Sequence, residues 1–231
     1  MKSILTLFLV VMSLLYESQN SNIRKDSLIQ NEFATLIPYK IKNKVVYVNQ
    51  KHKMIIAPQF SLGMFFNEDC NLLNSPNEKV RTFGSSDYAT VDLNKITYRI
   101  DKNGKKVYTF IKTDLGKCPS SYKSQKYKAY EMKGFYGLVD KNYIDEANPK
   151  DFVIYPQYQR LHVMEGDDIN NPMLVGINKD KFGVIDKTGK IIIPFIYNDI
   201  KLNYSWKLGK MFEVSKDGKN YFYINQNNVA Y

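Results

Sequence analysis

Two histidines and two cysteines are the residues of this 231-residue chain with the most distinctive chemistry. His52 and His162 lie far apart, and neither has a second ligand at the short spacing of a zinc site. The sequence leaves open a catalytic pair of a serine or cysteine with one of these histidines, because the members of a catalytic triad meet in space rather than in sequence. We expect both histidines to be solvated or capping side chains, and the sequence predicts no catalytic residue, metal site or cofactor.

Cys70 and Cys118 are the only cysteines, and they suit either a disulfide or two buried thiols. A bond between them would close a loop of about 48 residues, worth at most about 4 kcal/mol in loop-closure entropy. Separately buried, each thiol would act as a small apolar side chain. The sequence leaves both interpretations open, because it does not give the distance between the two residues.

Acidic and glycine-rich motifs do not indicate a bound ion or nucleotide. The densest acidic cluster, Glu165-Gly166-Asp167-Asp168, lacks the alternating ligands of a calcium loop, so we expect an acidic loop without a metal. Neither a dinucleotide fingerprint nor a phosphate-binding P-loop occurs in the sequence. The 18 tyrosines and 13 phenylalanines suit stacking on sugars or contact with a partner, or else cross-strand aromatic pairs that stabilise short strands.

The formal net charge of +10 makes the surface basic. Only four of the 33 basic residues are arginines, and the lysines are scattered along the chain. Reading bases and phosphates relies on the planar guanidinium, so the composition does not favour a nucleic-acid partner. We expect a solvated lysine-rich surface, with lysine-driven binding of an anionic polymer as an alternative.

The first twenty residues are typical of an export signal. Lys2 precedes an uncharged run, Ile4 to Leu15, of twelve residues. A membrane-spanning helix needs roughly 20 apolar residues, whereas a secretory signal peptide has this length and these flanks. We therefore expect residues 1–20 to be a signal peptide and 21–33 a polar linker. The mature chain would be periplasmic or secreted and would have no transmembrane anchor.

A repeated unit fills the rest of the chain. Its clearest copy runs from residue 181 to 197, and residues 135–158 repeat both of its halves around an insertion. An Asp or Asn recurs at the same place in each copy, at positions 49, 101, 140, 186 and 225. Such spacing indicates about five divergent copies in one domain, residues 34–231.

Each copy predicts short antiparallel strands around a tight turn. Asp186 suits the first position of a type I turn, and Gly189 supplies the positive φ after it. The β-branched run before Pro194 predicts a strand that this proline ends, because proline has no N–H for the ladder. With one strand before each copy, the unit has about three strands. We expect the incomplete last copy to be an edge or cap, and helix only around 26–32.

The pattern of an aromatic residue, glycine, two apolar residues, Asp-Lys-x-Gly-Lys, three aliphatics, proline and tyrosine resembles the WG (KWG) repeat of bacterial proteins. The resemblance implies a β-rich repeat architecture in an often exported protein, and it implies no activity. The family tryptophan is Phe182 or Tyr136 here. The residues that match the signature are Phe182, Gly183, Asp186, Gly189, Pro194, Tyr197, Tyr136, Gly137 and Asp140.

The predicted fold is all-β, with tandem antiparallel three-stranded repeats in an open solenoid-like or partly closed array. The predicted function is that of an exported, non-catalytic binding or scaffold protein whose partner is an unknown protein or glycan at the cell envelope. The alternative is an enzyme acting on envelope polysaccharide or peptidoglycan. It would need two carboxylates about 5–10 Å apart in a cleft. Asp140 and Asp186 are better explained as turn residues.

Overall fold

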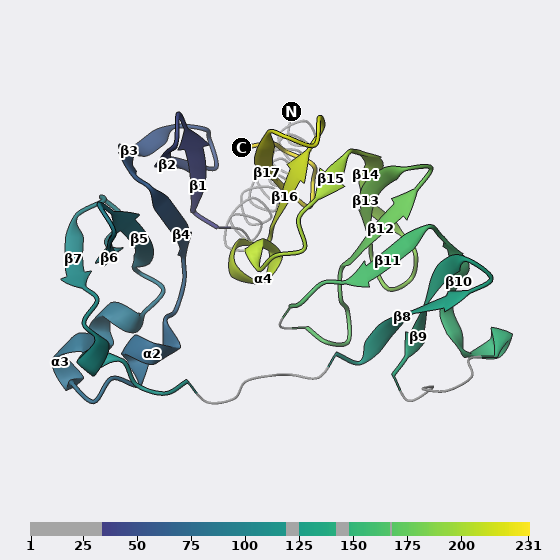
Figure 1. The fold of residues 1–231 in the computed structure, drawn as a ribbon, viewed down its shortest axis with the longest axis horizontal. Helices are drawn as coiled ribbons and strands as arrows, with labels where there is room; N and C mark the ends of the chain where they lie inside the picture. Colours follow the sequence, from purple (N-terminus) through teal and green to yellow (C-terminus); the bar gives the residue numbers. More distant parts are fainter. Residues whose placement is uncertain (1–33, 119–124, 142–147, 167) are drawn as a thin grey trace, which may run out of the picture.

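A computed structural model describes residues 34–118, 125–141, 148–166 and 168–231. The predicted signal peptide, the linker and the helix expected around 26–32 lie outside these residues. The described part forms five small antiparallel sheets of three or four strands (Figure 1). The prediction of an all-β fold built from tandem antiparallel repeats is confirmed.

The five sheets follow one another along the chain and are numbered here in that order. The first contains β1 (Leu36–Ile41), β2 (Lys44–Asn49) and β3 (Met54–Phe60), and the second β4 (Leu62–Phe66), β5 (Ala89–Leu93), β6 (Ile96–Ile100) and β7 (Lys106–Thr109). The third contains β8 (Tyr127–Met132), β9 (Phe135–Asp140) and β10 (Phe152–Tyr158), and the fourth β11 (Arg160–Val163), β12 (Leu174–Asn178), β13 (Lys181–Ile185) and β14 (Ile191–Tyr197). The fifth contains β15 (Asp199–Ile200), β16 (Met211–Ser215) and β17 (Tyr221–Asn225).

Short helices that the sequence did not predict lie in the loops between strands. In the second sheet they are α2 (Cys70–Leu73), α3 (Glu78–Arg81), η1 (Thr82–Gly84) and η2 (Lys112–Asp114). The others are η3 (Pro149–Asp151) and α4 (Ser205–Gly209). Asp69 caps α2 by accepting hydrogen bonds from the N–H groups of Asn71 and Leu72. None of these helices is long enough to show a helical period in the sequence.

One turn, organised by the recurring Asp or Asn, has the same hydrogen bonds in four sheets. Asp186 Oδ1 accepts from the N–H groups of Thr188 and Lys190, and the Gly189 N–H donates to the Asp186 carbonyl. The same pattern is built on Asn49, Asp101 and Asn225. The residue at the glycine position has a positive φ in every case: 60° at His52, 82° at Gly104, 86° at Gly189 and 59° at Asn228. The turn after Asp140 lies outside the described residues.

Gly189→Val should destabilise the protein by about 1–3 kcal/mol, because a β-branched side chain is strained at positive φ. Gly189→Asn should cost much less, since Asn tolerates this region and already occupies it at Asn228. Lys187→Val is the matched control, because Lys187 does not have a positive φ. Thermal melts would compare the three variants. If Gly189→Val were as stable as Gly189→Asn, the assignment of this turn would be contradicted.

Four signature residues of the clearest copy lie on β13 and β14, and β14 has a bulge opposite β13. They are Phe182, Gly183, Pro194 and Tyr197. Phe182 pairs with Tyr197 and Val184 with Ile193, so three residues of β14 oppose Gly183 alone. A Cβ on Gly183 would lie 2.9 Å from the Ile193 carbonyl oxygen, which explains the glycine. Tyr136 and Gly137 have the same relation to β10, where Tyr136 pairs with Tyr158.

The expectation that Pro194 ends its strand is wrong. β14 continues to Tyr197, and Pro194 lies in the bulge between the paired residues Ile193 and Tyr197. A residue in a bulge does not need to donate to the ladder, so the missing N–H of proline has no cost there. The proline therefore marks the bulge instead of the end of the strand.

The last strand of one sheet often runs directly into the first strand of the next. Single residues connect β3 to β4, β10 to β11, and β14 to β15; they are Ser61, Gln159 and Asn198. This connection adds a strand at the start of the second and fourth sheets, which is why the predicted three-stranded unit becomes four-stranded there.

The sheets form an arc whose order differs from their order in the chain. Along the arc lie the second, first, fifth, fourth and third sheets (Figure 1). The fifth sheet therefore lies in the middle, between the first and the fourth. The expectation that the last copy is an edge or cap is wrong, because residues of β16 and β17 pack against the first two sheets.

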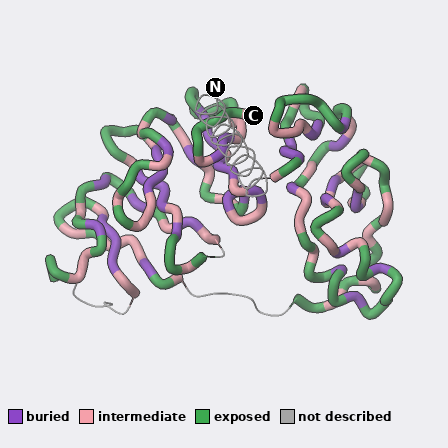
Figure 2. The backbone as a smooth tube through the Cα atoms, turned by 180° about the vertical axis from the view of Figure 1, so that it is seen from behind, coloured by how far each residue is buried: buried purple, intermediate pink, exposed green. Residues whose placement is uncertain are grey.

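Apolar clusters lie between neighbouring sheets, and the described residues do not share one central core. Separate clusters join the second sheet to the first, the fifth to the fourth and the fourth to the third. Buried segments are accordingly spread along the whole arc in Figure 2. Nearest-neighbour packing of this kind is typical of repeat proteins.

Candidate binding groove at the junction of the first and last sheets

A fourth apolar cluster, here called the junction cluster, joins the N-terminal half of the domain to the C-terminal half. Its buried members are Ile37, Phe65 and Met211. Tyr223 of β17 meets the Phe65 ring edge-on, with ring centroids 5.1 Å apart. The Asn67 side-chain amide donates to the Leu208 carbonyl at 3.2 Å. Strands from both ends of the domain are thus fixed side by side.

Two adjoining cavities open beside this cluster and form one groove, here called the edge groove. The first, of about 220 Å³, is lined by Pro38, Tyr39, Lys40, Val45, Ser61, Leu62, Gly63, Glu213, Tyr221, Phe222 and Tyr223. The second, of about 300 Å³, is lined by Pro38, Leu62, Gly63, Met64, Phe65, Asn203, Tyr204, Ser205, Leu208 and Tyr223. They share Pro38, Leu62, Gly63 and Tyr223, and we name them the polar and the apolar cavity.

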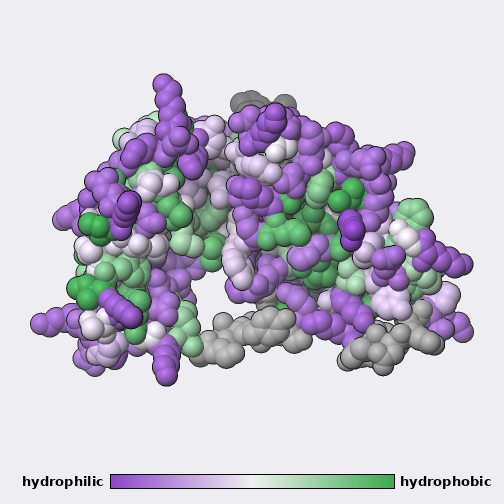
Figure 3. Space-filling view, in the orientation of Figure 1, coloured by the Kyte–Doolittle hydropathy of each residue, from purple (hydrophilic) through white to green (hydrophobic). Residues whose placement is uncertain are grey.

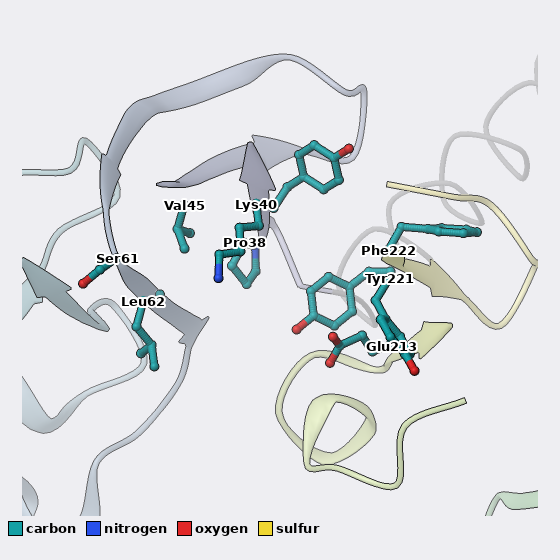
Figure 4. A pocket seen from close by; sticks show the side chains of 11 residues that line it. Pro38, Lys40, Val45, Ser61, Leu62, Glu213, Tyr221 and Phe222 are labelled. Atoms are coloured by element: carbon teal, nitrogen blue, oxygen red, sulfur yellow. The ribbon is translucent and has the colours of Figure 1, made fainter. Parts of the chain in front are cut away.

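The walls of the edge groove come from two sides of the arc. In the close view, side chains of β1, β2 and the start of β4 face those of β16 and β17 across the polar cavity (Figure 4). On the molecular surface the same region is a recess between the second sheet and the fifth (Figure 3). Several large apolar side chains reach solvent here, and Leu62, Met64 and Tyr204 are 46%, 45% and 58% exposed.

Three strands that line the groove are the outer strands of their sheets. β1 is the first strand of its sheet, β4 is the first strand of the second sheet, and β17 is the last strand of the fifth. An outer strand pairs on one side only in its sheet, so its other edge can receive a further strand. The outer edge of β17 is already partly paired, because Ile224 forms a bridge with Ala230 and the Tyr231 N–H donates to the Tyr223 carbonyl. Pro38 in the middle of β1 suits an edge position, because it has no N–H to donate.

The charged and polar groups of the polar cavity are mostly engaged. Glu213 forms an ion pair with Lys201 and accepts from the Asn203 amide at 2.6 Å. Lys40 forms no ion pair or hydrogen bond with a described residue. Burial raises the pKa of Tyr223, and the nearby Glu213 carboxylate raises it further, so its hydroxyl stays protonated at neutral pH.

One hydroxyl in the apolar cavity has no partner among the described residues. Ser205 is 5% exposed, and its Oγ makes no hydrogen bond within the protein. Its neighbours in the wall are mainly apolar, among them Met64, Phe65 and Leu208. A buried hydroxyl without a partner carries a desolvation cost that a bound acceptor would remove.

The edge groove contains few carboxylates. Glu213 is the sole carboxylate among the residues lining the two cavities, and Lys201 neutralises it. The pair of acids that glycoside hydrolysis uses is therefore not assembled in this groove. Within the described ranges, no group of three or more potential ligands is placed to hold a metal.

His52, His162 and Glu165 do not line the edge groove, although the cavity beside His162 shares Asn203 and Tyr204 with the apolar cavity. His52 is in the first repeat turn, and its ring stacks on Tyr231 with centroids 5.0 Å apart. His162 lines a third cavity of about 180 Å³ with Glu165 and Tyr204, and burial lowers the pKa of its imidazole. Glu165 bridges to Lys207 at 3.0 Å. Sequence reasoning missed the edge groove, because its residues come from segments far apart in the chain that meet only in the fold.

The two cysteines form a disulfide in the structure, with Cα atoms 5.3 Å apart. Cys70 begins α2, and the Gly116 N–H donates to the Asn71 carbonyl at 2.9 Å. The bond therefore holds the end of the second-sheet segment against α2. It does not lie in the edge groove, so its role is in stability.

The Cys70→Ser/Cys118→Ser double variant should be less stable by about 2–4 kcal/mol, because the unfolded chain regains a loop of about 48 residues. Urea unfolding of oxidised wild type, reduced wild type and the double variant would measure this. Reduction should shift the wild type to the stability of the variant and leave the variant unchanged. Free, alkylatable thiols in protein from its native compartment would contradict the bond.

Comparisons with known proteins identify the repeat. The family described as "WG containing repeat" matches residues 47–70 and 182–219, so the chain contains WG repeats. These ranges include the turns after Asn49 and Asp186 and the bulged strands β3 and β14. No curated protein matches the chain.

Two solved structures are weakly similar to the chain. The "Crystal structure of the eukaryotic initiation factor" is 10% identical, with 86% of this chain and 52% of that chain covered and a TM-score of 0.30. The structure of Kluyveromyces lactis Hsv2 is 12% identical, with 86% and 60% covered and a TM-score of 0.31. The chain thus spans between half and two thirds of their lengths. These TM-scores are too low to give this chain the fold of either protein.

Among the described helices, none has both the length and the apolar character that crossing a bilayer requires.

Proposed function

We propose that this WG-repeat protein is an exported, non-catalytic binding protein and that the edge groove is its contact surface. The observation that carries the proposal is the set of exposed apolar and aromatic side chains around two adjoining cavities. Leu62, Met64 and Tyr204 are exposed together in the wall of one cavity, and a contiguous exposed apolar patch of this kind marks an interaction site. The single, neutralised carboxylate supports binding over hydrolysis.

Export rests on the uncharged run behind Lys2. Cell fractionation followed by N-terminal sequencing of the native protein tests it. The mature protein should be found outside the cytoplasm and begin between about residues 17 and 24. Recovery of cytoplasmic protein that retains Met1 would contradict export.

Binding is tested by affinity capture from envelope and medium fractions with the full chain. Three baits are compared: wild type, Leu62→Lys/Met64→Lys, and Ile96→Lys/Ile191→Lys. The control replaces isoleucines of similar exposure outside both cavities, and it adds the same charge. The captured partner should be retained by wild type and control and lost by the groove variant. Equal capture by all three baits would exclude the edge groove as the contact surface.

A further inference from the structure

We propose that the edge groove binds an extended peptide segment, which adds as a strand to the outer edge of β4. Its apolar side chain would enter the apolar cavity, and an acidic side chain would lie near Lys40. This inference rests on the proposed function and names the ligand class of the same site.

The strand edges favour a peptide over other ligands. β4 pairs only with β5 in its sheet, and four consecutive residues of it, Leu62 to Phe65, line the groove. The first sheet already contacts part of β4, since the Met64 carbonyl accepts from the Tyr47 hydroxyl at 2.8 Å and Val45 lies against Gly63. An extended peptide satisfies the remaining backbone groups of an edge strand through main-chain hydrogen bonds. Because β4 has five residues, a bound segment of about five residues would match it.

The apolar cavity supplies the anchor pocket. Met64, Phe65 and Leu208 form its walls together with the rings of Tyr204 and Tyr223. A sugar placed there would bury hydroxyl groups with few partners, which is unfavourable. An aliphatic or aromatic side chain fits these walls, and a side chain next to it on the same strand would point away from them.

Two polar groups without a partner among the described residues would orient a bound peptide in the groove. The Ser205 hydroxyl is buried in the wall without a partner, so it can donate to a carbonyl of the peptide. At the other end of the groove Lys40 is exposed and makes no contact with a described acidic group, whereas Glu213 is held by Lys201. The unneutralised lysine favours an acidic residue in the peptide.

The experiment is selection of displayed random peptides on the immobilised full chain, followed by synthesis of the enriched sequence. Fluorescence anisotropy then measures its affinity for wild type, Met64→Lys, Ser205→Ala, Lys40→Glu and the control Ile96→Lys. Met64→Lys should weaken binding by at least about tenfold, as loss of an anchor contact does. Ser205→Ala and Lys40→Glu should weaken it by about threefold to tenfold. Ile96→Lys should bind as wild type does.

Two further readouts separate strand addition from other modes. N-methylation of the peptide at successive positions should block binding at every second residue, because alternate N–H groups of a strand point to the paired edge. The melting temperature of Ser205→Ala should be equal to or above that of wild type, which shows that its binding defect is not a folding defect. Binding that tolerates N-methylation everywhere would overturn the proposal.

Failure of this inference is distinguishable from failure of the proposed function. Capture of the native partner can depend on Met64 even though the selection yields no peptide whose binding depends on Met64. In that case the groove binds a ligand of another class, and this inference is wrong. Met64-dependent binding of a peptidoglycan oligosaccharide or of dodecanoate, without peptide binding, would lead to the same conclusion. Capture that is unaffected by the groove variant would reject both proposals.

Discussion

Replacing Arg99 with methionine should lower the free energy of unfolding by about 3–5 kcal/mol, the range for disrupting a buried charged network. Arg99 is 2% exposed although it lies on β6 at the place that Val184 occupies in β13. Its guanidinium donates to the carbonyls of Phe83, Asn67 and Ser85 at 2.8–2.9 Å and to the Thr90 hydroxyl at 3.1 Å. Each acceptor left without a donor would cost roughly 1–3 kcal/mol.

The reason for the large effect is that Arg99 organises a whole loop. Three of its four acceptors lie in the connection between β4 and β5, which also contains α2 and α3. Burial lowers the pKa of Arg99, and the nearby Asp69 raises it in part, yet an arginine stays charged at neutral pH. Methionine fills a similar volume but donates no hydrogen bond.

Arg81→Met is the matched control. Arg81 also donates to a backbone carbonyl, that of Ser75 at 2.8 Å, but its side chain is 48% exposed. Water can replace this donor, so the control should cost less than about 1 kcal/mol. Urea unfolding measures both variants, and hydrogen exchange should show lost protection in residues 67–88 of Arg99→Met. A loss below that of the control would refute the organising role of Arg99.

Phe65→Ala should cost about 3–5 kcal/mol, as large-to-small changes of a buried aromatic ring do. Phe65 is 4% exposed at the centre of the junction cluster, and its ring contacts Tyr223. Among the described residues, the hydrogen bonds and ring contacts between 34–118 and 125–231 all lie at this junction. We therefore expect Phe65→Ala to separate the two halves of the arc as well as to destabilise them.

Ile193→Ala provides the comparison, because Ile193 is fully buried in the cluster between the fourth and fifth sheets. It should reduce the melting temperature without changing the dimensions of the folded protein. Small-angle X-ray scattering below the melting temperature should give a larger radius of gyration for Phe65→Ala and an unchanged one for Ile193→Ala. Equal radii for both variants and wild type would mean that the junction cluster does not hold the arc together.

Local features of the fold follow from neighbouring residues, and they could be predicted. The turn after Asp186 needs one side-chain acceptor and one residue that tolerates positive φ, and both lie within five residues. This is why the repeat was visible even where Asn49 and His52 replace Asp and Gly. The two-residue turns before β2, β6, β9 and β13 carry lysine at positive φ, as at Lys42 and Lys179, so they lack the usual Asn-Gly or Asp-Gly signature of a tight hairpin.

Features that depend on distant residues could not be predicted. In the sequence, Arg99 is not distinguishable from the other 32 basic residues. Only its burial against the connection between β4 and β5 shows that it organises this loop. In the sequence, Pro194 indicates the end of a strand, and only the pairing of Tyr197 with Phe182 shows that it lies in a bulge. In both cases the deciding contact comes from a part of the chain that the local pattern does not contain.

The sequence by itself determined the all-β class, the repeat and the chemistry of its turns, because each depends on side chains within a few positions of one another. Only the tertiary structure decided that the fifth sheet packs against the first and that the outer strands β1, β4 and β17 meet at one groove. The packing of sheets depends on apolar residues far apart in the chain, such as Ile37, Phe65 and Met211. These residues repeat in no pattern, since the junction they form occurs once in the arc.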